Sequence, residues 1–179
     1  MSKKQKVAIY PGSFDPIHSG HILVIKQAAE VFDKVVVLIA ENPDKTYKVG
    51  AISRAILVKK FLEGYEWASN VKVDATTDSL VSYCEKKGIS YVVRGLRNGV
   101  DLEYEKTQYE YNETLVKTLP NFNYVYFVTP PQAAHLSSTG VRQFMKYADV
   151  AQLKKLYLLA GVSRSDDKVF EDLIHLYKE

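Results

Sequence analysis

Apolar runs of strand length alternate along this chain with stretches whose apolar residues recur at helical spacing. This alternation limits the possible folds more than any other feature. Residues 35–40, which read VVVLIA, have no polar side at all. Strands of that kind are buried on both faces, and when helices separate them they form parallel sheets. The sequence therefore indicates the α/β class.

The predicted elements follow the order of a doubly wound sheet. We predict strands at residues 7–10, 35–40, 71–75, 91–94 and 124–129, and helices at residues 18–32, 52–63, 80–87, 101–117, 138–147, 151–159 and 166–177. This order gives a Rossmann-like five-stranded parallel sheet with helices on both faces and extra C-terminal helices. We expect one domain over residues 1–179, with a core at about 6–147 and a helical tail at about 148–179. The leucine pattern of the tail indicates core or subunit packing.

Composition narrows the class of protein. The net charge is +3, and Lys and Arg are spread along the chain, whereas nucleic-acid binders gather basic residues on one face. The apolar runs are far shorter than the ~18 residues of a membrane span. The basic start leads directly into a strand, not into a secretory signal, and Cys84 has no second cysteine to pair with. We expect a cytoplasmic protein that binds neither nucleic acid nor membrane, and a small anionic substrate is compatible with its charge.

Sheets of this type bind ligands beyond the carboxyl ends of their strands. The segment after the first strand contains GSFDPIHSGH, in which Ser13 follows a glycine and His18 and His21 share the first turn of a helix. Such a turn offers free N–H groups and a positive dipole end to an anion. We interpret the histidine pair as part of a phosphate site. An ordinary helix start is the simpler alternative, and zinc is a weaker one because no third ligand is evident.

Basic residues follow two other predicted strands. Lys45 lies near the end of the second strand, where an ordinary surface lysine is the alternative. Arg94 and Arg97 bracket a glycine after the fourth strand, in an arrangement that suits either multidentate phosphate binding or surface salt bridges.

The helix predicted at 101–117 has a polar stripe inside its apolar side. At ~100° per residue, Asp101, Glu105, Gln108 and Asn112 fall on one face. Carboxylates and amides are costly there unless they are paired. They could bond the Arg94 and Arg97 region, a ligand or a neighbouring subunit.

Three hydroxyl residues precede the next predicted helix. One of Ser137, Ser138 and Thr139 would serve as its N-cap, and Arg142 follows in the first turns. A second helix N-terminus directed at phosphate would account for the others.

These motifs together resemble a known family. GSFDPIHSGH is similar to the HxGH signature of a nucleotidyltransferase superfamily. RGLRNGVDLEYE with Asn112 downstream, LSSTGVR, and the Asn42-Pro43-x-Lys45 segment resemble blocks of the bacterial phosphopantetheine adenylyltransferases. The resemblance runs in order over residues 6 to about 147.

The resemblance implies adenylyl transfer from ATP to 4′-phosphopantetheine, with release of pyrophosphate. It implies catalytic roles for Ser13, Lys45 and His21; nucleotide contacts by Ser13, Phe14, His18, His21, Arg97, Glu105, Ser137, Ser138, Thr139 and Arg142; and acceptor contacts by Ser13, Lys45, Ser79, Leu80, Arg94 and Asn112. It also implies Mg²⁺ bound with ATP, no metal site of the protein itself, coenzyme A as a feedback ligand, and a homohexamer.

The chain departs from the family pattern on the acceptor side. The stretch KTQYEY places Gln108 and Tyr109 where the family has small and apolar residues, and Ser79 stands where leucine is usual. A related nucleotidyltransferase that uses CTP or another phosphorylated acceptor is therefore an alternative. A non-catalytic nucleotide sensor is a more remote one.

Overall fold

The computed structural model describes residues 5–41, 46–159, 161–162 and 166–178. The strands are β1 (Val7–Gly12), β2 (Lys34–Ala40), β3 (Val71–Thr76), β4 (Tyr91–Leu96) and β5 (Asn123–Val128). The helices are α1 (Ser19–Val31), α2 (Ala51–Glu63), a 3-10 helix (Glu66–Asn70), α3 (Leu80–Lys87), α4 (Gly99–Leu115), α5 (Pro131–Ala134), α6 (Ser138–Met145), α7 (Val150–Leu159) and α8 (Lys168–Lys178).

The strands form one parallel sheet in the order β3-β2-β1-β4-β5, so the direction of winding reverses between β1 and β4. β1 pairs with β2 along its whole length, from Val7 to Gly12. Its pairing with β4 is recorded only at Ala8 and Ile9. The two central strands therefore separate toward their carboxyl ends, which is where sheets of this topology bind ligands.

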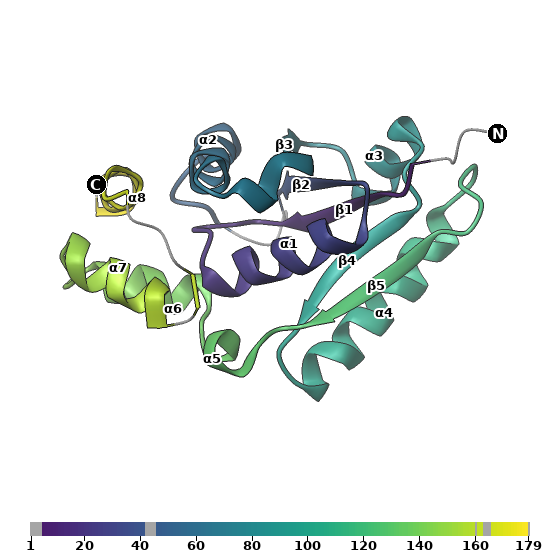
Figure 1. Cartoon of the computed structure of the whole chain (residues 1–179). Helices are drawn as coiled ribbons and strands as arrows, with labels where there is room; N and C mark the ends of the chain where they lie inside the picture. The colour runs from purple at the N-terminus through teal and green to yellow at the C-terminus, as the bar shows by residue number, and fades with distance from the viewer. Residues whose placement is uncertain (1–4, 42–45, 160, 163–165, 179) are drawn as a thin grey trace.

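Helices cover both faces of the sheet, and each face has its own core (Figure 1). The larger core holds side chains of α1 and α2, such as Ile25 and Phe61, together with those of the C-terminal helices. The smaller core lies under α3 and α4 and includes Cys84 and Val92. Apolar burial on both faces explains why the central strands carry almost no polar side chains.

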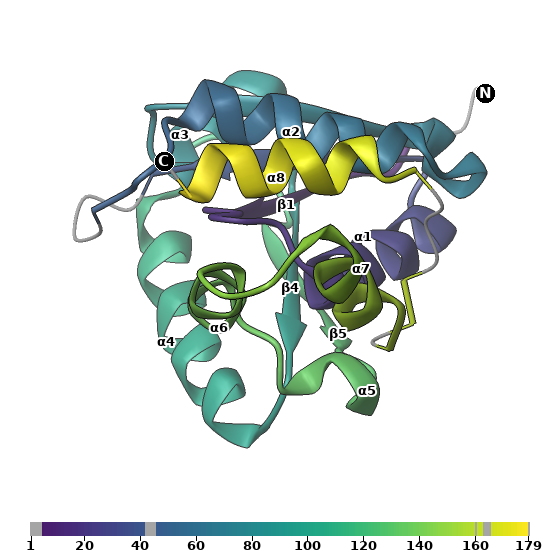
Figure 2. The same ribbon diagram turned by 90° about the vertical axis from the view of Figure 1, so that its left-hand side faces the viewer.

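The C-terminal helices pack on the larger core near the carboxyl end of β1, and α8 lies along α2 (Figures 1 and 2). Leu153, Phe170 and Leu173 are buried, which confirms that much of the leucine pattern in the tail serves the core. Leu159 is 69% exposed, so of the two roles expected for the tail leucines it does not have the core one within this chain. It is the last residue of α7, where the packed face of the helix ends.

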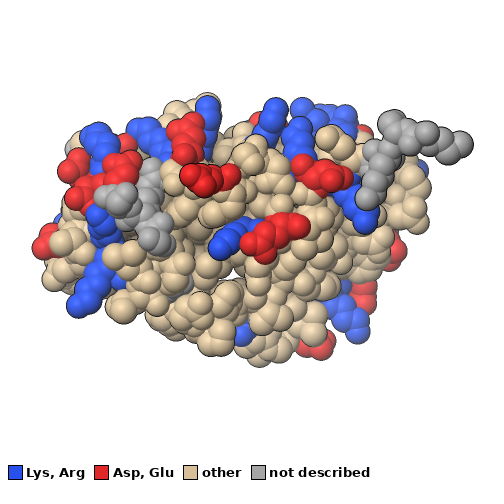
Figure 3. Space-filling model, viewed as in Figure 1, with Lys and Arg blue, Asp and Glu red and all other residues tan. Residues whose placement is uncertain are grey.

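The predicted fold class is confirmed, and every predicted strand and helix is present within a few residues of its expected ends. Sequence periodicity missed the 3-10 helix and α5, because five and four residues are too short to show a helical period. No helix among the described residues has the length and apolarity that crossing a membrane requires. Basic and acidic side chains are interspersed on the face drawn in Figure 3.

Candidate active site

Arg94 joins β1 and β4 at the switch point of the sheet, beyond the last recorded pair of the two strands. Arg94, on β4, donates from Nη1 to the carbonyl of Pro11 on β1 at 3.2 Å. The loop that follows Pro11 carries Ser13 and Phe14 and leads into α1. This bond therefore places the β4 arginine at the start of the first predicted phosphate segment.

His18 and His21 lie face to face at the start of α1. Their rings stack with centroids 3.7 Å apart, and Nδ1 of His21 accepts a hydrogen bond from the backbone N–H of His18 at 3.3 Å. Nδ1 of His18 is buried and has no hydrogen-bond partner among the described residues. The pair thus forms one unit whose ring nitrogens are not all used by the protein.

Burial keeps both imidazoles neutral. It lowers the pKa of His18 to about 3, with a smaller contribution from the positive charge of Arg97. Burial also lowers the pKa of His21 well below its usual value, and the neighbouring His18 and Arg97 add to the effect. Since Nδ1 of His21 accepts a hydrogen bond, the proton of its neutral ring is on Nε2. His21 can therefore offer a neutral N–H donor to a phosphate oxygen.

The loop before the histidines has an unusual backbone. Phe14 has φ of 46°, in the left-handed region that residues other than glycine rarely occupy. Its buried ring makes edge contacts with Tyr10 and His21, with centroids at 5.5 and 4.9 Å. A Cβ at Gly12 would lie 3.0 Å from that ring, which explains the glycine. The packing of Phe14 holds the loop in a strained shape beside the histidines, as is common at binding sites.

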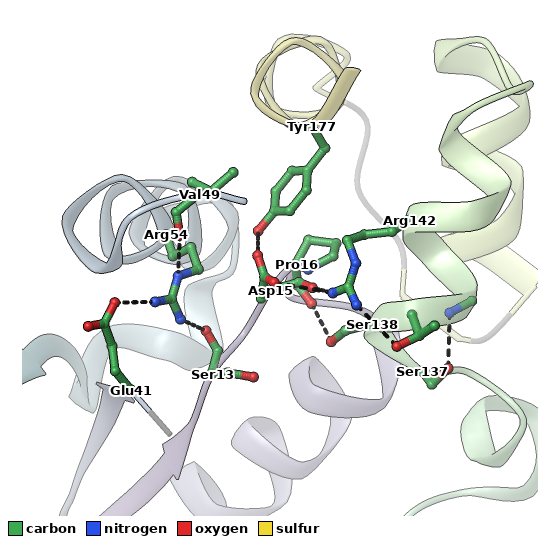
Figure 4. A network of polar contacts seen from close by, with 12 residues as sticks. Ser13, Asp15, Pro16, Glu41, Val49, Arg54, Ser137, Ser138, Arg142 and Tyr177 are labelled. Carbon is green, nitrogen blue, oxygen red and sulfur yellow. Dashed lines mark hydrogen bonds and ion pairs between the residues drawn. The ribbon is translucent and has the colours of Figure 1, made fainter. Parts of the chain in front are cut away.

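Arg54 holds the same loop from α2, and the sequence interpretation missed it. The side chain is fully buried, and it donates to the carbonyls of Ser13 and Val49 and to the carboxylate of Glu41 (Figure 4). Helical spacing places Arg54 on the apolar side of α2 with Leu57 and Phe61. A lone cation on such a face needs a partner, and that signal could have identified it.

Arg94 in β4 and Arg97 just after it each form an ion pair with a carboxylate of α4. Arg94 donates from Nε and Nη2 to the two carboxylate oxygens of Glu105, each at 2.6 Å. Arg97 bonds Asp101 in the same way at 3.0 Å, and this pairing lowers the pKa of the Asp101 carboxyl. Of the three roles considered for the polar stripe of α4, bonding to the arginines is the one seen for Asp101 and Glu105.

Asn112, farther along α4, bonds a tyrosine of β5. Its amide lies 2.7 Å from the hydroxyl of Tyr124. The ring of Tyr109 packs edge-on against Tyr124 with centroids 5.3 Å apart, and its hydroxyl donates to Glu113 at 2.9 Å. Tyr109, which departs from the family pattern, and Asn112, a predicted acceptor residue, are therefore part of a tyrosine cluster between α4 and β5.

Two other predicted acceptor residues lie apart from these contacts. Ser79 is the N-cap of α3, and its Oγ accepts from the backbone N–H of Ser82 at 3.2 Å. Leu80 is partly buried against the smaller core. Both follow β3, which β2 separates from β1 in the sheet.

The hydroxyl cluster at α6 meets the loop after β1 (Figure 4). Ser137 caps α6 by accepting from the backbone N–H of Gly140 at 3.1 Å, as one hydroxyl was expected to do. Ser138 donates to the carbonyl of Pro16 at 2.9 Å, and Arg142 donates to the backbone carbonyl of Asp15 and, at 3.1 Å, to the hydroxyl of Thr139. The second helix N-terminus is thus attached to the first phosphate segment.

Lys45, together with Asn42 and Pro43, lies outside the described residues. The predicted nucleotide residues lie after β1, at the start of α1, after β4, in α4 and at the start of α6, and direct contacts join these segments.

Comparisons with known proteins agree with this arrangement. The cytidylyltransferase-like family model matches residues 9–144. The phosphopantetheine adenylyltransferase of Alkaliphilus metalliredigens is 36% identical over 160 residues, covering 89% of this chain and 98% of that protein. The enzyme of the same name from Rubrobacter xylanophilus is 37% identical over 168 residues, covering 91% of this chain and 99% of its own.

Solved structures support the fold alone. The nicotinic acid mononucleotide adenylyltransferase of Plasmodium falciparum, solved with NaAD, superposes with a TM-score of 0.66 at 19% identity, covering 98% of this chain and all of the other.

The sequence matches extend over nearly the whole length of the relatives at more than 30% identity. The chain therefore belongs to the phosphopantetheine adenylyltransferase family, within the cytidylyltransferase-like nucleotidyltransferases.

Proposed function

We propose that this protein transfers the adenylyl group of ATP to 4′-phosphopantetheine, forming dephospho-coenzyme A and pyrophosphate. The observation that carries the proposal is that Arg94 and Arg142 both bond the segment that runs from the end of β1 to the histidines, at the switch point of the sheet. The names of the relatives supply the acceptor. Neutral donors and cations around one loop suit a reaction that joins two anions.

The reaction needs little acid–base chemistry from the protein. A phosphate monoester is ionised at neutral pH, so one of its oxygens can attack the α-phosphorus of ATP directly. The bond from that phosphorus to the oxygen that links it to the β-phosphorus breaks as the new bond forms, and this oxygen leaves with pyrophosphate. Catalysis then consists of holding the two anions in line and stabilising the charge that develops.

The residues divide by element in this scheme. His18 and His21 would donate N–H groups to the reacting phosphates, and Ser13 with Phe14 would line the same loop. The triphosphate would lie on the cations and hydroxyls of β4, α4 and α6: Arg97, Glu105, Ser137, Ser138, Thr139 and Arg142. The acceptor would be held by Arg94, Asn112, Ser79 and Leu80, and Lys45 would stabilise the developing charge.

Arg94 retains donors for an acceptor phosphate. A guanidinium has five N–H groups. Glu105 accepts two of them and Pro11 a third, which leaves two. The carboxylate of Glu105 fixes the plane of the guanidinium, so that the remaining donors have a defined direction.

Magnesium would arrive with ATP. Among the described residues there is no group of three or more His, Cys, Asp or Glu side chains suited to hold a metal ion. Mg²⁺ in nucleotide sites is commonly bound through phosphate oxygens and water with few protein ligands. The ion would supply charge neutralisation at the triphosphate, and the chain's own donors would orient the reacting groups.

The acceptor is the part of the proposal that needs direct testing. The tyrosine cluster around Tyr124 and Tyr109 lies beside Asn112, where this sequence departs from the family pattern. That departure favours, as a second candidate, transfer to a different phosphorylated acceptor or from CTP. Pyrophosphate release should be measured with ATP and CTP, each with phosphopantetheine and with other phosphate monoesters. A strict preference for CTP, or no response to phosphopantetheine, would reject the first proposal.

Assembly and regulation are further parts of the proposal. We expect a homohexamer in the cytoplasm, with coenzyme A as a feedback ligand at the acceptor site. One side of α4 supports self-association, since Val100, Tyr104, Tyr111 and Leu115 are 58–78% exposed and lie on one helical face. Light scattering after size exclusion gives the mass. A monomer at working concentration contradicts the hexamer.

A further inference from the structure

The three C-terminal helices all bond one short segment of the loop after β1. From α6, Arg142 bonds Asp15 and Ser138 bonds the carbonyl of Pro16. From α7, the hydroxyl of Tyr157 donates to the carbonyl of Ile17 at 2.5 Å. From α8, the hydroxyl of Tyr177 donates to Oδ1 of Asp15 at 2.7 Å (Figure 4). Segment 15–17 lies between Phe14 and His18, so all these bonds hold the approach to the histidine pair.

The two tyrosine hydroxyls are buried and stay protonated. Tyr157 is fully buried, and its ring packs against those of Phe61 and Phe170, with centroids 5.7 and 5.3 Å away. Tyr177 is 7% exposed and Asp15 5%. Burial raises the pKa of both tyrosines, and the carboxylate of Asp15 adds to the effect at Tyr177. Both hydroxyls therefore keep the protons that they donate to Ile17 and Asp15 over the physiological pH range.

We propose that α7 and α8 clamp segment 15–17 of the loop after β1. In this proposal Tyr157 and Tyr177 are positioning residues that keep His18 and Arg142 in the arrangement that binds ATP. The ligand named here rests on the proposed function. The claim that these helices hold the loop in place does not rest on the proposed function, because it follows from contacts within the chain.

Asp15 transmits the effect of Tyr177. Its carboxylate accepts from Tyr177 on Oδ1 and from Arg142 on Oδ2, the latter at 3.3 Å. Without the tyrosine hydroxyl, a buried carboxylate oxygen loses its donor, and the carboxylate is free to turn toward other donors. Arg142 would then lose its fixed orientation. Arg94 is bonded instead to Pro11 and Glu105, so the acceptor side should be affected much less.

Tyr177→Phe and Tyr157→Phe test the clamp in the full chain, since each keeps the ring and removes only the hydroxyl. We expect Tyr177→Phe to raise the Kd and the KM for ATP about tenfold or more, because its bond is to a charged group. Tyr157→Phe should raise them about threefold to tenfold. The KM for phosphopantetheine should stay within about twofold, and amide hydrogen exchange in peptides covering residues 12–22 should become faster.

A matched control separates positioning from stability. Ile89 is buried just before β4 begins, at the edge of the sheet opposite the loop. Ile89→Ala should lower the melting temperature without changing the Kd for ATP or exchange in the loop. If Tyr177→Phe does not fold, Tyr157→Phe and the same control carry the test.

The outcomes are distinct. If both tyrosine variants lower the melting temperature as the control does, but leave ATP affinity and loop exchange unchanged, the clamp is overturned. If the wild type binds ATP but releases no pyrophosphate with phosphopantetheine, the proposed function fails while ATP affinity still decides the clamp. If the wild type does not bind ATP, the nucleotide role fails, and unchanged loop exchange in the variants overturns the clamp as well.

Discussion

Arg94 and Glu105 face each other through two hydrogen bonds of 2.6 Å that join β4 to α4. The side chain of Glu105 is only 10% exposed. We expect Glu105→Gln to lower the free energy of unfolding by about 1–3 kcal/mol, because the arginine would lose one charged partner in a partly buried site. Urea denaturation measures this change. The control is Glu103→Gln, an exposed position on the same helix, which should stay within about 0.5 kcal/mol of the wild type.

His21→Ala tests the predicted donor. We expect kcat to fall about 100- to 1,000-fold, which is the usual effect of removing one donor to a developing oxyanion. Steady-state pyrophosphate release measures kcat, and circular dichroism reports the fold. If kcat is unchanged while the melting temperature falls, His21 has a structural role only.

The buried histidines predict an acid-sensitive fold. The pKa of His18 is lowered to about 3 and that of His21 is also lowered, against about 6.5 in the unfolded chain. Between those values the unfolded state binds more protons, so their contribution to stability is full above about pH 6.5 and is lost as the pH falls. The slope should be at most about 1.4 kcal/mol per pH unit for each histidine.

Denaturation between pH 5 and 7 isolates this effect, since carboxylates of lowered pKa such as Asp101 and Asp172 titrate below that window. The double variant His18→Asn, His21→Asn should show a nearly flat profile there. A wild type whose stability is already flat over the same range contradicts the assignment of neutral, buried imidazoles.

Arg54 and Glu41 should respond unequally to mutation. Arg54→Met leaves the carbonyls of Ser13 and Val49 without their donor, so we expect a loss of about 3 kcal/mol or more. Glu41→Gln should cost less than about 1 kcal/mol, because the Glu41 side chain is 42% exposed. Equal losses in a denaturation experiment would mean that the ion pair, and not the bonds to the loop, is what Arg54 contributes.

Sequence patterns were sufficient for the fold because apolar runs of strand length, such as VVVLIA in β2, alternate with stretches long enough to form helices. The strand predicted at residues 35–40, for example, differs from β2 only in that β2 begins one residue earlier, at Lys34. α5 was missed because Pro131–Ala134 is a single turn, whose hydrogen bonds depend on the loop around it.

The site could be predicted only in part. The strand-end rule located His18, His21 and the arginines, because parallel topology places all strand ends at one edge. The residues that bond to them could not all be predicted. That Tyr177 reaches Asp15 across 162 positions depends on how distant helices pack, and no local pattern encodes that.

The most direct test of the account is acceptor-dependent pyrophosphate release by the purified full-length protein with ATP and Mg²⁺. We predict that release requires 4′-phosphopantetheine, that dephospho-coenzyme A forms in equal amount, and that Arg94→Met raises the KM for this acceptor more than the KM for ATP. ATP binding with no pyrophosphate release at any phosphopantetheine concentration would contradict the account.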